Sequence, residues 1–353
     1  MSGVDAARVV VPCADLDEAV SWFCDQLGFQ LDAIWPADDP SHAVVVLEGL
    51  TLELRRASPD GDTIIVVPGV APDGMSPPRG VRVEFGPVAD VELAPYEERI
   101  LVTHLDDSTG WVIGRAGMRY RDLAPGRLGG RYIASHIEIP DGGPVPDYVH
   151  HHDIRFQVIV CVAGWVRLVY EDQGEPFVLR AGECVLQPPG IRHRVLEASA
   201  GLEVLEVSGP AEHVTHRERH IELPTPVARP DREFGGQRFA RHDREVGGWA
   251  PWRGGPLECQ DTDVAVASAG IGRVRFVRAG QRSVEPGAWS NDDAELLLLY
   301  CAAGSATVEF GVAEQPSVGV ERGSAIVVPP GCPFRVVEPD DALRLVELGV
   351  WAT

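Results

Sequence analysis

One β-rich stretch of this sequence occurs twice, and this repeat limits the possible folds more than any other feature. Residues 148–164 (YVHHHDIRFQVIVCVAG) align without a gap with residues 288–304 (AWSNDDAELLLLYCAAG). Further on, residues 182–197 (GECVLQPPGIRHRVLE) align with residues 323–338 (GSAIVVPPGCPFRVVE), after a shift of one residue. Because so many turn-forming Gly and Pro positions coincide, the sequence predicts a duplicated β-domain.

From about residue 96 onward, the chain has almost no helical periodicity. Short β-branched and aromatic runs alternate with Gly/Pro turns, as in FQVIVCVAGWVRLVYED and ECVLQPPG. This pattern is typical of antiparallel barrels and sandwiches. Residues 222–256 are polar and rich in Pro and Gly, which favours a linker. We therefore expect one β-domain over residues 96–221 and a second over residues 257–353.

The amino-terminal residues have a different pattern. A strand is predicted at RVVVPC, followed by a helix that begins after Asp15 and ends at Gly28. Three strand-like runs follow: FQLDAIW, HAVVVLEG and LTLELRR. These elements predict a small β-α-β-β-β module over residues 1–60. Residues 61–95, rich in Gly, Pro and Asp, are expected to form a linker with one strand, TIIVV.

Three histidines of the first β-domain have the spacing of a metal site. Side chains two positions apart on a strand share a face, so His150 and His152 should point the same way and His151 the opposite way. His193 follows a Pro-Pro-Gly turn at the start of a strand, so a hairpin can return it to the pair. Imidazoles are common ligands of divalent transition metals. The alternative is that these histidines only line the barrel as polar side chains.

The second β-domain lacks these residues. It has Ser290, Asn291, Asp292, Leu297 and Phe334 where the first has its three consecutive histidines, Gln157 and His193. A single carboxylate without imidazole partners holds a transition metal poorly. We expect the second domain to bind no metal, because Leu297 and Phe334 would fill the space that an ion needs.

At these positions the chain resembles the cupin family. The family's first motif, G-x5-H-x-H-x(3,4)-E-x6-G, matches from His150 to Gly164, with Gln157 where Glu is usual and Pro144 in place of the leading Gly. Its second motif, G-x5-P-x-G-x2-H-x3-N, matches at GECVLQPPGIRH, with Glu197 in place of Asn. The resemblance covers roughly residues 115–350. It implies a mainly β fold of two tandem cupin barrels (double-stranded β-helix, jelly-roll), here preceded by the small α+β module.

The resemblance also implies a function. It implies metal ligation by His150, His152 and His193, with Gln157 at the position of a fourth ligand. Because imidazole and amide ligands are neutral, we expect the site to favour a small anionic, chelating substrate. Three-histidine Fe(II) sites of cupins resemble those of dioxygenases that act on enolates or hydroxylated aromatic acids. We therefore expect one divalent metal, Fe(II) before Zn, Mn or Ni. A non-redox isomerase or lyase and a non-catalytic small-molecule binder are the alternatives.

Several polar residues flank the two motifs and are candidates for substrate binding. They are Tyr148, Arg155, Gln187 and Arg192. An arginine at the mouth of a barrel can pair with a substrate carboxylate, although a solvated surface position is the alternative. Three further histidines, His213, His216 and His220, lie in a charged segment after the first barrel and are expected to be solvated.

The amino-terminal module resembles one module of the vicinal oxygen chelate superfamily, the glyoxalase-like fold. The resemblance lies in VVVPCADLDEAVSWFCDQLGF and HAVVVLEGLTLELRR. Members bind metal through a His on the first strand and a Glu on the last. Here Arg8 stands near the first position and only Glu53 suits the second. We therefore expect a packing or dimerisation module without a metal, and a homodimer.

The net charge of −22 argues against binding of nucleic acid or an anionic membrane, because both need a basic surface. No apolar run is long enough to span a bilayer, and the first residues lack a signal-peptide pattern. The seven cysteines are scattered, which favours reduced thiols and a cytoplasmic protein.

Overall fold

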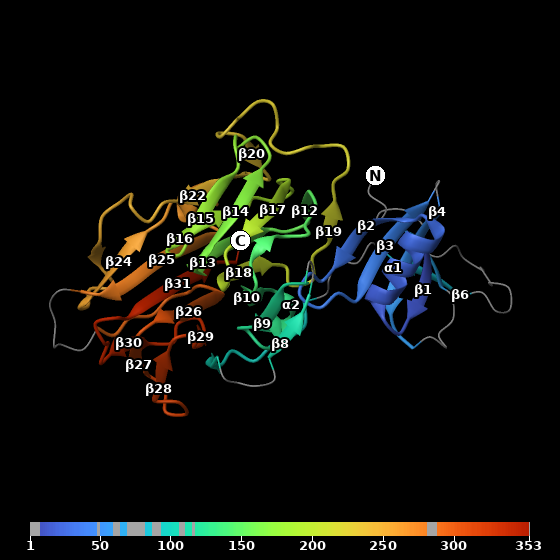
Figure 1. Cartoon of the computed structure of the whole chain (residues 1–353). Coiled ribbons are helices and arrows are strands. Elements are labelled where there is room, and N and C mark those ends of the chain that lie inside the picture. Colours follow the sequence, from blue (N-terminus) through green and yellow to red (C-terminus); the bar gives the residue numbers. More distant parts are fainter. Residues whose placement is uncertain are drawn as a thin grey trace.

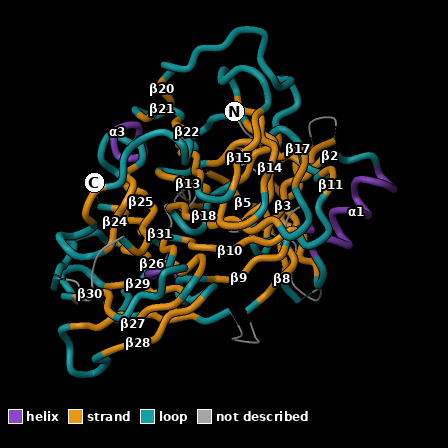
Figure 2. The backbone as a smooth tube through the Cα atoms, turned by 60° about the vertical axis from the view of Figure 1, so that its left-hand side comes forward, coloured by secondary structure: helices purple, strands orange, loops and turns teal. Residues whose placement is uncertain are grey.

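The chain folds into two β-barrels and a smaller amino-terminal module (Figures 1 and 2). The computed structural model describes residues 8–47, 50–58, 64–68, 82–86, 93–105, 110–114, 117–280 and 288–352. The predicted mainly β fold, with two tandem cupin barrels after a small α+β module, is confirmed.

The amino-terminal module is one sheet covered by one helix. Its elements are β1 (Arg8–Cys13), α1 (Leu16–Leu27), β2 (Gln30–Trp35), β3 (His42–Leu47), β4 (Leu50–Arg56), β5 (Ile64–Pro68) and β6 (Arg82–Gly86). The Asp15 side chain accepts a hydrogen bond from the amide of Glu18 at 2.9 Å, so the predicted helix start is confirmed. The helix ends at Gly28, whose φ of 75° is a left-handed conformation that favours glycine.

Residues 61–95 are more than a linker. The described strand β5 pairs antiparallel with β1, and β6 pairs parallel with β5, so both extend the sheet of the module. The sequence analysis had ended this module at residue 60, and that boundary was wrong. The strand predicted at TIIVV is present as β5, but the surrounding Gly- and Pro-rich residues concealed β6 and the place of both strands in the sheet.

The first barrel consists of two facing sheets. Its elements are β8 (Trp111–Ile113), β9 (Arg119–Asp122), α2 (Arg127–Gly130), β10 (Ile133–Ile139), β11 (Gly143–Pro144), β12 (His150–His152), β13 (Phe156–Ala163), β14 (Trp165–Tyr170), β15 (Phe177–Arg180), β16 (Glu183–Leu186), β17 (His193–Ala198), β18 (Leu202–Gly209), β19 (Thr215–Arg217) and β22 (Ala240–His242). One sheet has the order β22-β16-β13-β18-β10-β9-β8, and the facing sheet begins β15-β14-β17-β12-β19.

The second barrel repeats this plan. Its elements are β7 (Leu101–Thr103), β23 (Ala250–Pro251), β24 (Leu257–Asp261), α3 (Val264–Ala267), β25 (Gly272–Ala279), β26 (Leu296–Ala303), β27 (Ser305–Phe310), β28 (Ser317–Glu321), β29 (Ala325–Val328), β30 (Phe334–Val337) and β31 (Arg344–Val350). A small hairpin of β20 (Glu233–Phe234) and β21 (Gln237–Arg238) lies between the barrels in sequence.

Two short strands cross the predicted domain boundaries. β7 precedes the first barrel in sequence but pairs with β29 of the second barrel. β22 lies within the predicted linker 222–256 but pairs with β16 of the first barrel. The predicted bounds of the first barrel (96–221) and of the linker (222–256) therefore need correction. A strand of three residues is too short for its periodicity to be visible.

The two barrels pack against each other through their larger sheets. On β13, Phe156 and Val158 belong to an apolar cluster that also contains Leu296 and Leu298 of β26. The residues between these positions point to the opposite face of each strand, toward the interior of its own barrel. Both strands are therefore buried on both faces, which explains their nearly continuous apolar sequences.

The module and the first barrel share one sheet. β19 pairs with β12 of the barrel on one side and with β2 of the module on the other. In Figure 1, β19 accordingly lies between the barrel strands and the blue module. This pairing covers the β2 edge of the module.

The helices within the described segments are short. α1 has 12 residues, and α2 and α3 have four each. Among the described residues, no helix has the length and apolar character needed to cross a membrane. All seven cysteines lie in described segments as free thiols, five of them buried.

Candidate metal centre

The three predicted histidines come together inside the first barrel. His150 of β12 and His193 of β17 are directly paired across neighbouring strands, and His152 follows two positions after His150 on the same face. Their ring centroids lie 4.2 Å apart for His150 and His193, and 5.1 Å apart for the other two pairs. All three side chains are buried, and one potential ligand atom from each lies within 4.8 Å of the others.

Hydrogen bonds at Nδ1 orient the three imidazoles. The Nδ1 partners are the carbonyl of Tyr148 for His150 (2.8 Å), the carbonyl of Ile191 for His193 (3.0 Å) and the hydroxyl of Thr215 for His152 (2.9 Å). A carbonyl can only accept, so His150 and His193 carry a proton on Nδ1 and a lone pair on Nε2. Such outer hydrogen bonds are the usual support of metal-binding histidines, and this geometry fits a divalent ion.

A chain of hydrogen bonds runs beside the histidines. The Tyr170 hydroxyl donates to Gln187 Oε1, Gln187 Nε2 donates to Gln157 Oε1 at 2.8 Å, and Gln157 Nε2 donates to Glu206 Oε1 at 2.6 Å. Gln187 Nε2 also lies 3.5 Å from His193 Nε2. The amide oxygen of Gln157, the expected fourth ligand, is therefore already engaged by a donor. Burial and the charge of Glu206 raise the pKa of Tyr170, so its hydroxyl remains protonated and available to donate.

Glu206 was not predicted from the sequence. It lies on β18, opposite Ile159 of β13, and lines the same cavity as the three histidines. The charge argument made from the sequence, in which only neutral side chains surround the ion, therefore needs correction. A signal was present: Glu206 interrupts an apolar strand, and the repeat has Glu347 at the aligned position.

The cavity at the histidines is small and mainly apolar. Its volume is about 70 Å³, and Ala37 from the loop after β2 of the module also lines it. Its other apolar residues are Met118, Tyr120, Ile137, Ile139, Ile159, Val166, Leu168, Val195, Leu202 and Val204. An engineered cavity of about 150 Å³ accommodates benzene, so this one suits a smaller group.

Of the four predicted substrate-binding residues, only Gln187 lines this cavity. Arg155 instead donates to the Trp351 carbonyl at 3.1 Å and to the Tyr132 hydroxyl at 2.7 Å. Arg192 forms an ion pair with Glu218 at 3.3 Å.

Tyr148 also lies outside the cavity lining, with the Arg217 guanidinium 4.7 Å above its ring. The predicted placement at the substrate cavity is therefore wrong for Tyr148, Arg155 and Arg192. Their nearness in sequence to the motifs did not determine which way their side chains point.

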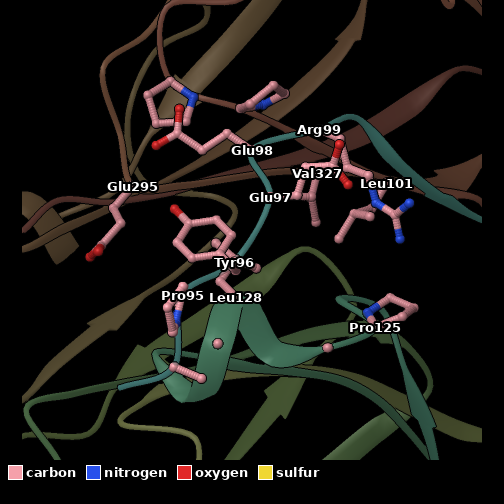
Figure 3. Close-up of a pocket in the computed structure, with 15 residues that line it drawn as sticks. Pro95, Tyr96, Glu97, Glu98, Arg99, Leu101, Pro125, Leu128, Glu295 and Val327 are labelled. Atoms are coloured by element: carbon pink, nitrogen blue, oxygen red, sulfur yellow. The ribbon is translucent and has the colours of Figure 1, made fainter. Parts of the chain in front are cut away.

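A larger cavity, of about 350 Å³, lies elsewhere (Figure 3). It is lined by the segment that contains Tyr96, Glu97 and Glu98, by the turn around Leu128 and by Glu295 of the second barrel. None of the sequence-predicted site residues lines it. Size alone therefore does not identify the functional site.

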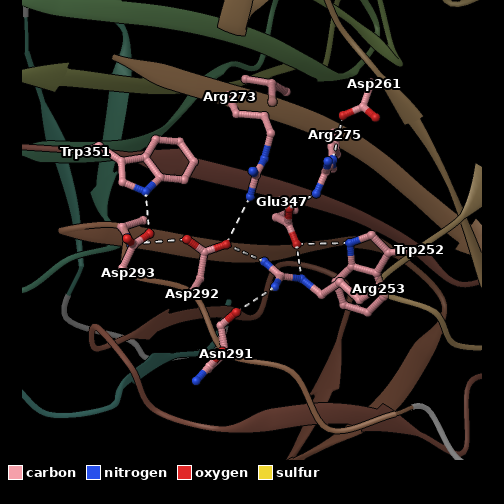
Figure 4. Close-up of polar contacts among 12 residues, drawn as sticks. Trp252, Arg253, Asp261, Arg273, Arg275, Asn291, Asp292, Asp293, Glu347 and Trp351 are labelled. Carbon is pink, nitrogen blue, oxygen red and sulfur yellow. Dashed lines mark hydrogen bonds and ion pairs between the residues drawn. The ribbon is translucent and has the colours of Figure 1, made fainter. Parts of the chain in front are cut away.

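An ionic network occupies the corresponding region of the second barrel (Figure 4). Arg253 contacts Glu347 at 2.6 Å and Asp292 at 2.9 Å, and its guanidinium lies 4.9 Å from the centre of the Phe334 ring. Arg273 contacts Asp292 at 3.0 Å and Glu347 at 3.4 Å. Burial alone would raise the pKa of Asp292, but hydrogen bonds from Arg253 and a backbone amide outweigh it and hold the pKa low.

The repeat shows what the Arg253 side chain replaces. Asp292, Phe334 and Glu347 align with His152, His193 and Glu206 of the first barrel. Arg253 touches all three, so a guanidinium lies among the positions that correspond to the histidine cluster. The expected filling by Leu297 and Phe334 is present, since both are buried, but the sequence analysis did not predict the charges beside them.

The amino-terminal module also holds a buried carboxylate. Glu53 is 1% exposed and pairs with Arg8 and, at 2.8 Å, with Arg55. Burial alone would raise the pKa of Glu53, but the two guanidiniums outweigh it and hold the pKa below its usual range. Glu53, the ligand position that the sequence analysis considered, is therefore paired with arginines.

Comparisons with known proteins agree with this architecture. Residues 6–94 match the model of the Glyoxalase/Bleomycin resistance protein/Dioxygenase superfamily. A search of curated proteins found no match. Among solved structures, the chain is similar to the 7S globulin of Momordica charantia, with a TM-score of 0.51 and 16% identity over 71% of this chain and 84% of that one.

Two oxalate decarboxylases are similar as well. A point mutant of the Bacillus subtilis enzyme has a TM-score of 0.50 and 14% identity over 72% of this chain and 78% of that one. The Lactobacillus farciminis enzyme, in a formate complex, has a TM-score of 0.51 and 14% identity over 72% and 86%. At such identities the likeness establishes the fold. The chain is a bicupin in fold, with a glyoxalase-like module at its amino terminus.

Proposed function

We propose that the first barrel is a metal-dependent enzyme for a small anionic, chelating substrate, and that it works as a non-haem Fe(II) dioxygenase. One observation carries this proposal. Three buried imidazoles, each held at Nδ1, converge at the wall of a small, mainly apolar cavity.

His150, His152 and His193 would hold the ion, with the Gln157 amide oxygen beside them. A bound ion of this kind supplies a Lewis acid for a chelating acid and, as Fe(II), redox chemistry toward dioxygen. The ligands themselves are neutral. The carboxylate of Glu206 and that of the buried Asp147, whose Oδ1 lies 3.6 Å from His150 Nδ1, offset part of a divalent charge from outside the ligand set, so positive charge remains at the ion itself. This remaining charge favours an anionic substrate.

The chain's own residues prepare the cavity for such a substrate. The hydrogen-bond chain from Tyr170 through Gln187 fixes the Gln157 side chain and presents its amide to Glu206. The carboxylate of Glu206 is placed to hold a proton removed from an enol or an acid inside the cavity. The apolar walls exclude water from the reacting group, which strengthens every charge interaction there.

The cavity volume of about 70 Å³ narrows the substrate class. It suits a compact enolate better than a hydroxylated aromatic acid, which would need the walls to move. The same small volume favours one second candidate, a non-redox lyase or isomerase that uses Mn, Zn or Ni. Two of the structural relatives are named for oxalate, a compact chelating diacid, which is consistent with a substrate of this size.

Oxygen dependence distinguishes the two candidates. The protein would be purified without added metal, analysed for bound ions, and reloaded with Fe(II), Mn(II), Zn(II) or Ni(II). Turnover of small enolic acids with matching oxygen uptake supports the dioxygenase, and turnover under nitrogen supports the lyase. Binding without turnover in every form would indicate a non-catalytic binder. A His150→Ala/His193→Ala variant should lose the ion, whereas His220→Ala, at an exposed position, should keep it.

A further inference from the structure

We infer that the chain has a second divalent-metal site, formed by His151, Asp153 and His216 on the outer face of the β12–β19 strand pair. The ligand class is a borderline ion such as Zn²⁺. This inference goes beyond the proposed function, because it uses none of the residues assigned to the first centre.

Strand register brings the two histidines together. His151 and His216 are directly opposite each other in the antiparallel pair of β12 and β19. Cβ atoms of directly opposed residues lie about 4.5–5.5 Å apart, close enough for two imidazoles to share one ion. The rings are stacked with centroids 4.9 Å apart and an angle of 19° between their planes. His151 points away from His150 and His152, so this pair belongs to the outer face.

Asp153 completes the set. It follows His151 by two positions, and its Oδ2 lies 2.6 Å from His216 Nε2. One potential ligand atom from each of the three residues lies within 4.8 Å of the other two. An ion would take the place of the shared proton between Asp153 and His216, and the two atoms would move apart slightly to coordinate it.

An unsatisfied nitrogen points to a ligand. Nδ1 of His151 is buried and has no hydrogen-bond partner among the described residues. A buried polar atom without a partner destabilises the fold, and a coordinated cation would give this nitrogen a partner. A proton shared between His216 and Asp153 does not satisfy this atom, so the ion pair alone leaves the cluster incomplete.

The donor set and its surroundings select the ion. Two imidazoles and one carboxylate suit Zn²⁺ and similar ions, and three protein ligands leave a position for water. The Asp153 side chain is 59% exposed, so an ion can enter from solvent. The nearby guanidinium of Arg192 is compensated by Glu218 at 3.3 Å and Glu171 at 3.7 Å, which limits its repulsion of a cation.

The position of the site suggests what the ion would do. β19 is the strand that joins the barrel to the module through β2. An ion shared by β12 and β19 would hold these two strands together, at the point where the module is attached to the barrel.

Zinc titration of the full-length chain tests the site. After metal removal, the protein would be equilibrated with Zn²⁺, and the bound zinc would be counted per chain by elemental analysis. We expect two ions for the wild type and one for His216→Ala. The His150→Ala/His193→Ala variant should also keep one ion, now the outer one, and the combined triple variant none. His220→Ala, a change of the same kind at an exposed position, should keep two.

Asp153→Ala is the variant least able to disturb folding, because the side chain is largely exposed, and it should lose the same ion as His216→Ala. Co²⁺ replacement gives an independent signal, since the visible absorption of the outer ion should disappear in Asp153→Ala and persist in the His150→Ala/His193→Ala variant. A wild-type count of one that falls to zero in His150→Ala/His193→Ala overturns the inference. Two ions in both Asp153→Ala and His216→Ala also overturn it. A wild type that binds one ion, kept in His150→Ala/His193→Ala and lost in Asp153→Ala, would support the outer site and count against the proposed function instead.

Discussion

At the scale of single residues, the chain shows which contacts a sequence reveals. The spacing of His150 and His152 on one strand indicated a shared face, and the structure places both in one cluster with His193. Glu206 was missed because a carboxylate inside a barrel is recognisable only once the facing strand is known. Arg155 was misplaced for the related reason that its partner, Trp351, is 196 residues away in sequence.

The carboxylate of Glu206 should increase the metal affinity of the first centre. We expect Glu206→Gln to weaken metal binding by about 10–100-fold, because outer hydrogen-bonding partners contribute affinities of that order. Competition with a metal-sensitive dye measures the affinity. Glu197→Gln makes the same change at a half-exposed position on β17 and should leave the affinity as it is. Equal affinities for wild type and Glu206→Gln would remove Glu206 from the site.

Glu53 should make the module sensitive to acid. Its folded-state pKa lies below the usual value of about 4.3, so its ionised form stabilises the fold above that pH, and the contribution is lost as the pH falls through the lower folded-state pKa. Glu53→Gln leaves Arg8 and Arg55 without their buried partner and should cost about 3–5 kcal/mol at pH 7. Urea unfolding of wild type and variant at several pH values measures both effects. A stability difference that did not shrink toward acid pH would contradict this assignment.

At the scale of elements, long strands and capped helices could be predicted, but short strands could not. α1 was recognisable because Asp15 and Gly28 mark its ends and its apolar residues recur at helical spacing. β7 and β22 have three residues each, and their place is determined by distant strands. The duplication itself was visible because turns need Gly and Pro at fixed positions, and these positions coincide in both repeats even where the surrounding residues differ.

The interior of the second barrel depends on Phe334. This ring is fully buried on β30, so Phe334→Ala should behave as a core truncation and cost about 3–5 kcal/mol. Metal content of the first barrel should stay the same, because the change is confined to the other barrel. Denaturant unfolding together with metal analysis tests both statements. Val266→Ala, at a 75% exposed position, should change stability by less than about 0.5 kcal/mol. An equally small effect of Phe334→Ala would indicate an open interior.

At the scale of the whole molecule, we propose that the amino-terminal module supports a homodimer. The β2 edge is already covered by β19, but α1 exposes Trp22 (52%) and Leu27 (47%) on the outside of the module. Trp22→Glu should shift the protein toward monomer, because a charge at an apolar contact opposes association. Sedimentation equilibrium at several concentrations measures the mass. Trp289→Glu is the matched control, since Trp289 is similarly exposed (49%) but lies in the second barrel. A wild type that sediments as a monomer throughout would contradict the proposal.

The guanidinium of Arg253 makes the second barrel independent of the supply of metal. A metal ion must be acquired from the surroundings, and it can be scarce, exchanged or removed by a chelator. The cation of the second barrel is the Arg253 side chain, which is part of the polypeptide. The second barrel can therefore reach its final form without any supply of metal, and it packs against the first barrel through the shared apolar interface. We expect the histidine cluster to be assembled in this way before an ion is loaded, so that the empty protein remains folded and ready to receive one.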